Sequence, residues 1–248
     1  MSIRGKVMAA AAVVTLVGGV SAAGTLAARA ATPSCYQNCI DLFSQKFGTH
    51  GAPSFVLNVL GQRGRVGQPI TLSPATNNNA GEDFIIFQQA RVSRFASLGL
   101  VSATVAQHYG GTCAQVSSTT HRCVRHYPND MAYEIEYAPN GVPSDLCVGV
   151  AHPASNGTKV VLERCSSGGR TTWVVDANAS LGRPYVPLIN GSDTNAKDPY
   201  VLNFPGSASP FQRPAPQLTT WKLQLYPNGR VFNNQLWSAN FGPLQGGF

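Results

Sequence analysis

From Phe55 onward the apolar residues of this chain come in short runs, and Gly, Pro and Asn separate the runs. Residues 55–59 and 146–150 are examples, and such runs are rich in Val, Ile, Phe and Tyr. Short β-branched and aromatic runs with turn residues between them are typical of the strands of a sandwich or barrel. The clearest turn is Pro227-Asn228-Gly229, because Asn-Gly tolerates the positive φ that a tight hairpin needs. The pattern therefore predicts an all-β domain over residues 55–248.

The segment before this domain has a different periodicity. In residues 34–50 the side chains of Cys39, Leu42, Phe43 and Phe47 recur at helical spacing, and Gly48 is suited to ending a helix. We expect residues 31–54 to form a short N-terminal helical segment that covers one end of the body.

The domain contains an internal repeat. Each of three units contains three apolar runs. The first run begins at Phe55, Leu146 and Tyr185 in the three units, the second at Gly67, Gly157 and Lys197, and the third at Phe84, Trp173 and Trp221. The first and second runs are 12, 11 and 12 residues apart in the three units. A supersecondary unit that cannot bury its apolar face alone gains a shared core by stacking with its copies. We expect one large aromatic from each unit, Phe84, Trp173 and Trp221, to point into this core.

Two segments interrupt the repeat. Phe84 and Trp173 are 89 residues apart whereas Trp173 and Trp221 are 48 apart, which indicates an insertion of about forty residues at 102–142. A Pro-rich loop at 205–216 lengthens the third unit. Both segments are expected to project from the body as loops.

The second unit resembles the ricin-B-type lectin family. It contains Leu146-Cys147-Val148-Gly149-Val150, then Asn156-Gly157-Thr158-Lys159-Val160-Val161-Leu162-Glu163-Arg164-Cys165, then Thr171-Thr172-Trp173. Units of that family read L-C-L-D-V, then N-G-T-x-V-x-L-x-x-C, then Q-x-W. The resemblance implies a single β-trefoil-like domain with three degenerate repeats and a disulfide between Cys147 and Cys165. The whole chain also resembles uncharacterised secreted proteins of Gram-positive bacteria.

The resemblance also indicates where a sugar would bind. The family uses an Asp at the fourth position of L-C-L-D-V, an aromatic on the second strand that stacks on the sugar ring, and an Asn just before Q-x-W. The corresponding residues are Asn58, Ser73 and Gly81 in the first unit, Gly149, Glu163 and Arg170 in the second, and Leu188, Asn203 and Leu218 in the third. Asn58 alone keeps hydrogen-bonding capacity at the Asp position. We therefore take Asn58, Thr71 and Glu82 as the candidate ligand-binding residues, and the second unit as structural.

The N-terminus has the features of a secretory signal peptide. Arg4 and Lys6 precede an apolar run over residues 7–20, and Ala28-Arg29-Ala30 matches an A-x-A cleavage site. The alternative is a membrane anchor, but the run is shorter than the ~20 residues that span a bilayer. We expect residues 1–30 to be removed, the protein to be secreted, and no later stretch to span a membrane.

All six cysteines lie after this segment, and an even number in a secreted chain indicates disulfides. Sequential pairing is preferred because each pair falls within one local unit: Cys35 with Cys39, Cys113 with Cys123, and Cys147 with Cys165. A zinc site made of Cys113, His121, Cys123 and His126 is the alternative for the middle pair. The disulfide is simpler in an oxidising compartment, so we expect no metal and no cofactor.

The composition of the chain limits the classes of partner that we expect it to bind. The net charge is +7, and it falls to +4 once the three basic residues of the signal peptide are removed. Charged residues make up 12% of the chain, which is about half the usual share. A nucleic-acid-binding protein would normally show clustered Lys and Arg, so we expect no nucleic-acid partner.

One pair of carboxylates could support catalysis. Glu134 and Glu136 alternate along Tyr133-Glu134-Ile135-Glu136-Tyr137, so on a strand their side chains share a face about 7 Å apart. That separation suits a glycosidase acid/base pair. Strand alternation alone predicts the same arrangement on an ordinary solvent-exposed face, and we favour that interpretation.

The sequence thus predicts a monomeric, non-catalytic extracellular binding module, with a carbohydrate or a cell-surface glycan as its ligand. The alternative is a degenerate trefoil without sugar sites. Such a protein would act as a protein-binding or inhibitor-like factor through loops 102–142 and 205–216. A glycosidase that uses Glu134 and Glu136 is a distant third hypothesis.

Overall fold

The computed structural model describes residues 39–49, 52–53, 55–76, 79–111, 113–117, 120–126, 130–176, 184–195 and 197–241. The predicted signal peptide and Cys35 lie outside these residues. Within the described ranges, no helix is both long enough and apolar enough to cross a membrane.

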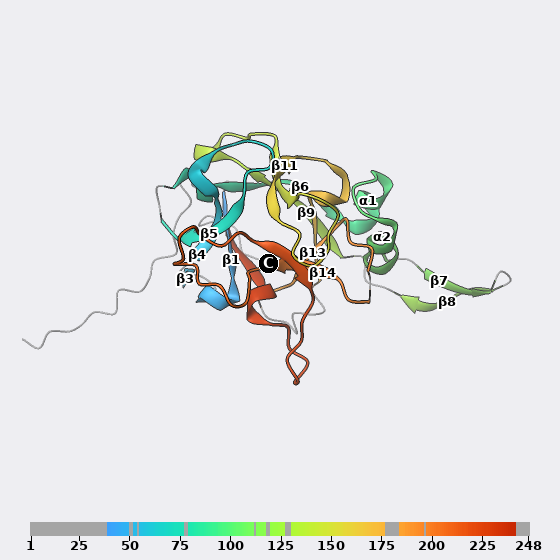
Figure 1. Ribbon diagram of the computed structural model, residues 1–248. Coiled ribbons are helices and arrows are strands. Elements are labelled where there is room, and N and C mark those ends of the chain that lie inside the picture. The colour runs from blue at the N-terminus through green and yellow to red at the C-terminus, as the bar shows by residue number, and fades with distance from the viewer. Residues whose placement is uncertain are drawn as a thin grey trace, which may run out of the picture.

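Twelve strands build the body of the protein (Figure 1). They are β1 (Ile40–Ser44), β4 (Phe55–Val59), β5 (Ile70–Pro74), β6 (Phe84–Arg91), β9 (Met131–Tyr137), β10 (Leu146–Val150), β11 (Val160–Arg164), β12 (Thr172–Val175), β13 (Leu188–Asn190), β14 (Tyr200–Asn203), β15 (Thr219–Lys222) and β16 (Trp237–Phe241). The described residues also form the short strands β2 (Gly48–Thr49) and β3 (Ala52–Pro53), the hairpin of β7 (Cys113–Ser117) and β8 (Thr120–His126), the helices α1 (Val92–Ser97) and α2 (Ala103–Tyr109), and several single 3-10 turns.

Six of the strands close into a barrel. β1 pairs with β6, β6 with β9, β9 with β12, and β12 with β13. On the other side β1 pairs with β16 through the whole strand, from Ile40–Phe241 to Ser44–Trp237. An isolated bridge between Val186 and Trp237 joins the segment before β13 to β16 and completes the ring. Closure leaves these strands without a free edge, which is the usual protection against edge-to-edge pairing.

Three two-stranded hairpins cover one end of the barrel. They are β4–β5, β10–β11 and β14–β15. Isolated bridges connect the second strands of the three hairpins to one another, and the pairs are Pro69 with Val161, Thr71 with Gln217, and Lys159 with Thr219. Each hairpin therefore touches both of the others around one axis. A six-stranded barrel capped by three such hairpins is the β-trefoil arrangement, so the predicted all-β, trefoil-like fold is confirmed.

Each third of the chain contributes one large aromatic to the core, but one of the three differs from the prediction. Phe84 and Trp173 are fully buried as expected, whereas the third is Trp237 and not Trp221. The indole N–H of Trp173 donates to Val148 O, and that of Trp237 donates to Leu202 O, both at 2.8 Å. The matching bonds show that the two indoles are equivalent in the two units.

Trp221 lies on β15 opposite Val201 of β14, and its side chain is 39% exposed. The sequence alignment had shifted the third unit by one strand. Residues 185–189 lead into the barrel strand β13, and the third hairpin begins only at Tyr200. A further turn, closed by the bridge between Leu225 and Val231, then delays the last barrel strand until Trp237. The extra turn and the Pro-rich loop together hid the correct register.

The predicted N-terminal helix is wrong. Ile40–Ser44 form strand β1, and only a single 3-10 turn, Gln45–Phe47, follows it. All five residues of β1 are buried, because β1 pairs along its full length with β16 and joins the barrel. The helical spacing of the apolar residues was overridden by this long-range pairing, as short apolar runs allow.

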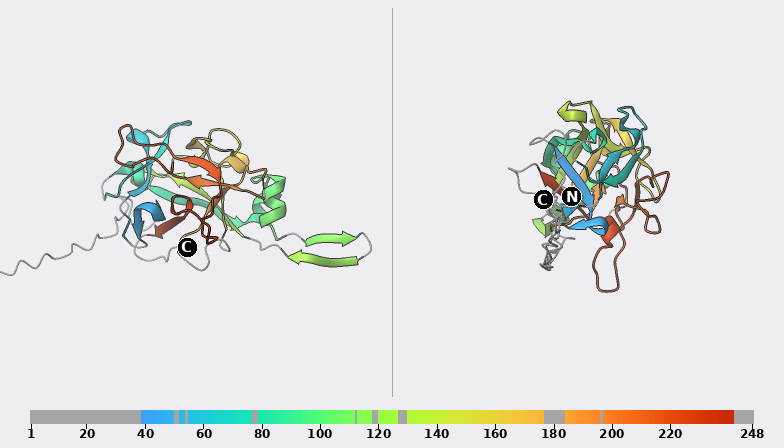
Figure 2. Two further views of the ribbon diagram at one scale, coloured as in Figure 1. Left: turned by 60° about the horizontal axis from the view of Figure 1, so that its bottom comes forward. Right: turned by 90° about the vertical axis from the view of Figure 1, so that its left-hand side faces the viewer.

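The inserted segment is also bounded differently from the prediction of 102–142. Between β6 and β9 the chain forms the helices α1 and α2 and the hairpin β7–β8, which extends away from the barrel (Figures 1 and 2). Phe95 of α1 and Val105 of α2 pack with Val174 and Ile189 of the barrel wall. Residues 131–137 are not part of an inserted loop, because β9 pairs with β6 and β12 in the barrel.

The predicted disulfide between Cys147 and Cys165 is present, with the Cα atoms 4.9 Å apart. It links the start of β10 to the end of β11 and so staples the second hairpin. Cys39 is disulfide-bonded as well. Its predicted partner Cys35 and the side chains of Cys113 and Cys123 lie outside the described residues, so those two pairings stay predictions.

We expect replacement of both Cys147 and Cys165 by serine to destabilise the fold by about 3 kcal/mol. The bridge closes a sequence separation of 18 residues, and a loop of this size restricts the unfolded chain by roughly that amount. Urea unfolding of the double variant and the wild type, both under non-reducing conditions, measures the difference. Equal unfolding midpoints would show that the bridge adds nothing to stability.

Candidate ligand-binding site

The strand register identifies equivalent positions in the three hairpins. Asn58 faces Thr71 in the first hairpin, Gly149 faces Val161 in the second, and Asn203 faces Thr219 in the third. Two residues further along each second strand stand Ser73, Glu163 and Trp221. The third hairpin therefore places an aromatic ring at the position where the resemblance requires one, and Asn203 at the Asp position.

The shifted third unit also hid the last member of the set. Trp237 follows Gln235-Leu236, so residues 235–237 form a Q-x-W, and Asn234 stands directly before it. Sequence reasoning gave Leu188, Asn203 and Leu218 for the three positions of this unit, whereas the structure gives Asn203, Trp221 and Asn234. The run Asn234-Gln235-Leu236-Trp237 is the signal that could have found them.

These three residues line one pocket with a volume of about 830 Å³. Its walls come from hairpin β14–β15, the turn at residues 157–159 of the second unit, the loop at 205–207 and the segment 224–234. Lys46, from the turn after β1, adds a fifth part. The pocket thus lies where all three thirds of the chain meet, and its volume falls within the usual range for small-molecule sites.

Buried amides form one wall of the pocket. The Asn234 side chain donates to Asn203 Oδ1 and to Phe204 O, both at 2.9 Å, and Asn203 Nδ2 donates to Thr219 Oγ1 at 3.3 Å. Each amide oxygen has two lone pairs and each amide nitrogen two hydrogens. Asn203 uses one of each in these bonds, so it retains capacity to accept from and donate to a ligand.

Aromatic rings form another wall. Trp221 stands beside the glycine turn of the second hairpin, where a Cβ added at Gly157 would lie 3.8 Å from the indole Cζ3. Gly157 has φ +80°, which favours glycine, and the bare backbone leaves room for the ring. Tyr226 stacks on Phe232 with ring centroids 4.3 Å apart. Both Trp221 and Tyr226 are partly exposed on the pocket side of the fold, so a ligand can reach their faces.

Two lysines complete the lining. Lys46 Nζ donates to Gly206 O at 2.9 Å and lies 5.2 Å from the ring centroids of both Phe47 and Phe204. Partial burial lowers the pKa of Lys46. Lys159 sits beside Thr219 through a backbone bridge, and its side chain is exposed. Lys46 reaches the pocket only because β1 closes the barrel, so no local pattern in the sequence could have indicated it.

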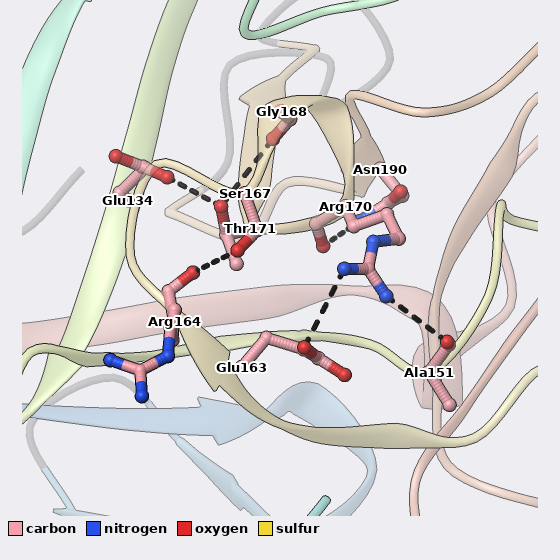
Figure 3. Close-up of polar contacts among 9 residues, drawn as sticks. All are labelled: Glu134, Ala151, Glu163, Arg164, Ser167, Gly168, Arg170, Thr171 and Asn190. Carbon is pink, nitrogen blue, oxygen red and sulfur yellow. Dashed lines mark hydrogen bonds and ion pairs between the residues drawn. The ribbon is translucent and has the colours of Figure 1, made fainter. Parts of the chain in front are cut away.

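The equivalent place in the second hairpin is filled by its own side chains. Glu163, at the ring position, forms an ion pair of 3.6 Å with Arg170, which also donates to Ala151 O at 3.2 Å (Figure 3). A Cβ on Gly149 would approach Arg170 O to 3.0 Å, so the backbone itself closes over the Asp position. That the second unit is structural and binds no sugar stays a prediction.

The first hairpin brings the predicted ligand-binding residues together but buries them. Asn58 Nδ2 donates to Thr71 Oγ1 at 3.4 Å, and Asn79 links Asn58 to Glu82 through bonds of 3.2 and 2.6 Å. Glu82 also accepts from Ser73 Oγ at 2.5 Å. The exposed fractions of Asn58, Thr71 and Glu82 are 8, 1 and 1%. Ligand binding by these residues stays a prediction. The amides of the third hairpin are buried to a similar degree, but they line a pocket together with the partly exposed ring of Trp221.

Glu134 and Glu136 do not form the solvent-exposed face that we predicted. Both are buried on β9 because turns of the second unit cover the strand. Glu134 accepts from Ser166 N at 2.9 Å and from Thr171 Oγ1 at 2.5 Å, as Figure 3 shows for Thr171. Glu136 accepts from Asp145 N at 2.7 Å. Their oxygens hold turns in place, and neither carboxylate lines the pocket.

Comparison with known proteins gives structural neighbours only. No protein family and no curated protein matches the sequence. The solved structures that resemble it include ThreeFoil, a designed threefold-symmetric protein, with 12% identity and a TM-score of 0.46 over 80% of this chain and 95% of that one. Another is a Caenorhabditis elegans protein with unknown function, with 11% identity and a TM-score of 0.43 over 83% and 94% of the two chains. The assignment of the fold rests on the strand pairing described above.

Proposed function

We propose that the protein is a non-catalytic carbohydrate-binding module whose binding site is the pocket of the third hairpin. The observation that carries the proposal is the partly exposed indole of Trp221 beside the buried amides of Asn203 and Asn234. A sugar ring has an apolar C–H face that stacks on an aromatic ring and a rim of hydroxyls that need hydrogen-bond partners. The pocket supplies both on adjacent walls.

The lining supports binding more than turnover. Hydrolysis of a glycosidic bond ordinarily uses two carboxylates on either side of that bond. The described residues that line the pocket include amides, aromatic rings, hydroxyls and lysines, but no Asp or Glu. Glu134 and Glu136, the pair that could have served in a glycosidase, are committed to the turns at residues 166 and 145.

We also propose that the protein acts outside the cell. The disulfide between Cys147 and Cys165 is of the kind that persists in oxidising compartments, and the N-terminal residues have the pattern of a signal peptide. Sequencing the N-terminus of the protein recovered from culture medium tests this. A mature chain that begins near residue 31 is the expected result, and retention in the cell with Met1 intact would contradict it.

We expect Trp221→Ala to weaken saccharide binding at least tenfold, because it removes the stacking platform, and Asn203→Ala to weaken it by about as much. A glycan array identifies the ligands, and isothermal titration calorimetry, which needs no tryptophan reporter, measures their affinity for the wild type and both variants. Competition by the free saccharide establishes specificity.

Phe87→Ala is the matched control for this test. Phe87 is an exposed aromatic on β6, outside the pocket, so its replacement should leave saccharide affinity unchanged. An array without hits at high protein concentration would overturn the proposal. Equal loss of affinity in Phe87→Ala and Trp221→Ala would place the binding site elsewhere.

The hairpin β7–β8 favours a second candidate function. It extends from the side of the body that carries α1 and α2, where a partner protein could reach both of its strands (Figure 2). In this case the protein would act as a protein-binding or inhibitor-like factor. Replacing residues 112–127 with a short Gly-Ser linker should then abolish partner capture while leaving saccharide binding and the unfolding midpoint unchanged.

A further inference from the structure

We propose that the pocket of the third hairpin selects acidic saccharides, whose carboxylate or sulfate group is held between Lys46 and Lys159. This inference rests on the proposed function, because it names the class of saccharide that the same site takes. The observations that carry it are the charges of the lining, the way Lys46 is held, and the residue at the Asp position.

The charges of the lining have one sign. Lys46 and Lys159 are its charged side chains, and no acidic residue is among the described residues that surround the pocket. Two acids of the second and third units, neither of which lines the pocket, are paired with other cations: Asp198 with Lys222 at 3.5 Å, and Glu163 with Arg170 at 3.6 Å. A concave site lined by one sign of charge concentrates ligands of the opposite sign.

Lys46 is held in position before any ligand arrives. Its ammonium group donates to Gly206 O and lies near two aromatic rings, those of Phe47 and Phe204. An ammonium group has three donors, so two remain after the bond to Gly206. Burial disfavours its charged form, as the lowered pKa shows, and an anion beside it would offset that cost. An acidic ligand therefore gains more from Lys46 than a neutral one does.

Lys159 lies next to the hairpin that carries the amide wall. Its backbone bridges to Thr219, the residue whose hydroxyl accepts from Asn203. It comes two residues after Gly157, against which Trp221 lies. A saccharide stacked on Trp221 with its hydroxyls on Asn203 would therefore carry its substituents between the two lysines.

The residue at the Asp position also favours an acidic ligand. Asn203 provides the hydrogen-bonding groups of that position without the negative charge. An aspartate there would repel an anionic ligand and would partly neutralise the two lysines. The neutral amide leaves the positive potential of the pocket intact.

The test compares matched pairs of saccharides that differ only in charge. We suggest galacturonate oligomers against their methyl esters, and 6-sulfated against unsulfated galactose oligomers. The acidic member of at least one pair should bind the wild-type protein about tenfold more tightly in about 50 mM NaCl, and the difference should shrink in about 0.5 M NaCl because salt screens exposed charges. Inorganic sulfate alone serves as the competitor that distinguishes a bare anion from an acidic sugar.

Four variants locate the effect. Lys46→Gln and Lys159→Gln should each weaken acidic binding by about three- to tenfold more than they weaken neutral binding, so the ratio of the two affinities should fall. Asn203→Asp should weaken acidic binding specifically. Lys197→Gln, an exposed lysine outside the pocket, is the matched control and should change neither.

Each outcome separates this inference from the proposed function. Equal affinity for acidic and neutral saccharides, unchanged in both lysine variants of the pocket, would overturn the selection of acidic ligands and leave carbohydrate binding in place. Absence of binding to any saccharide would overturn both. Complete displacement by low concentrations of inorganic sulfate would show that the lysines hold a bare anion and would overturn the saccharide class.

Discussion

Trp237→Ala is expected to destabilise the protein by about 3 to 5 kcal/mol, the usual cost of truncating a fully buried tryptophan. Trp237 has no exposed surface, and it packs in the same core cluster as Phe84 and Trp173. Its indole N–H donates to Leu202 O at 2.8 Å, and truncation removes that donor too. Urea unfolding monitored by circular dichroism measures the loss.

Trp221→Ala is the matched control, because the sequence pattern predicts Trp221 as the core aromatic of the third unit whereas the structure has Trp237 in that place. Trp221 is 39% exposed and lies on β15, so its replacement should change the free energy of unfolding by less than about 1 kcal/mol. If Trp221→Ala destabilised the fold as much as Trp237→Ala, the register of the third unit described here would be incorrect. Trp237→Phe keeps an aromatic ring but removes the indole N–H and part of the ring volume, so its cost should lie between those of the two alanine variants.

The two tryptophans also show how far the sequence could lead. The trefoil-like fold was predictable from its second unit, where a hairpin of ordinary length keeps Cys147, Cys165 and Trp173 at regular spacing. In the third unit the Pro-rich loop and the turn at residues 225–231 lengthen the connections. The burial of a side chain depends on which strand of the unit carries it, and a shift by one strand gave Trp221 of the hairpin the place of Trp237 on the barrel strand. Only the pairing of β14 with β15 settles that Trp221 points outward.

The candidate site depended on the same register. The spacing of the repeat places Asn203 at the stacking position, whereas the strand pairing places it at the Asp position, with Trp221 at the position of the aromatic ring. Lys46 was beyond prediction for a different reason: it is 157 residues before Asn203 in sequence, and only barrel closure by β1 and β16 brings the two together. Local patterns carry no information on such long-range contacts.

Buried carboxylates are the other feature that the sequence concealed. Alternation on residues 133–137 predicted a solvent-exposed face for Glu134 and Glu136, but a barrel strand whose outer side is covered by turns buries both faces. Glu134 is satisfied there by Ser166 and Thr171. The turns between strands therefore determine which polar residues of this fold are buried. Buried carboxylates in turn make the stability of the protein depend on pH.

The largest effect of pH is expected from Asp41. We expect the stability of the protein to fall as the pH rises from about 4 to about 8. Asp41 is 1% exposed, and neither of its carboxyl oxygens has a hydrogen-bond partner among the described residues. Burial first, and then the nearby charges of Glu82 and Asp83, raise the pKa of Asp41 from 3.8 to about 8. In this pH range the unfolded chain releases the proton while the folded protein retains it, so each unit of pH favours unfolding by up to about 1.4 kcal/mol.

The variant Asp41→Asn isolates this effect, since the amide is neutral at every pH and nearly the same size. Below about pH 4 both carboxyl and amide are uncharged, so the variant should be close to wild type in stability. Between about pH 4 and 8 the advantage of the variant should grow, and at pH 8 it should reach several kcal/mol, with about 5 kcal/mol as an upper bound from the pKa change. Glu82 and Asp130, whose pKa values burial also raises, keep a residual slope of the same sign in both proteins.

Urea unfolding at unit steps of pH measures the stability of both proteins. Asp198 is an exposed carboxylate paired with Lys222, so the curve of Asp198→Asn should run parallel to that of the wild type. Parallel curves for Asp41→Asn and wild type would mean that Asp41 is already ionised in the folded protein at neutral pH. That result would require a cation or water bound against it in the barrel wall.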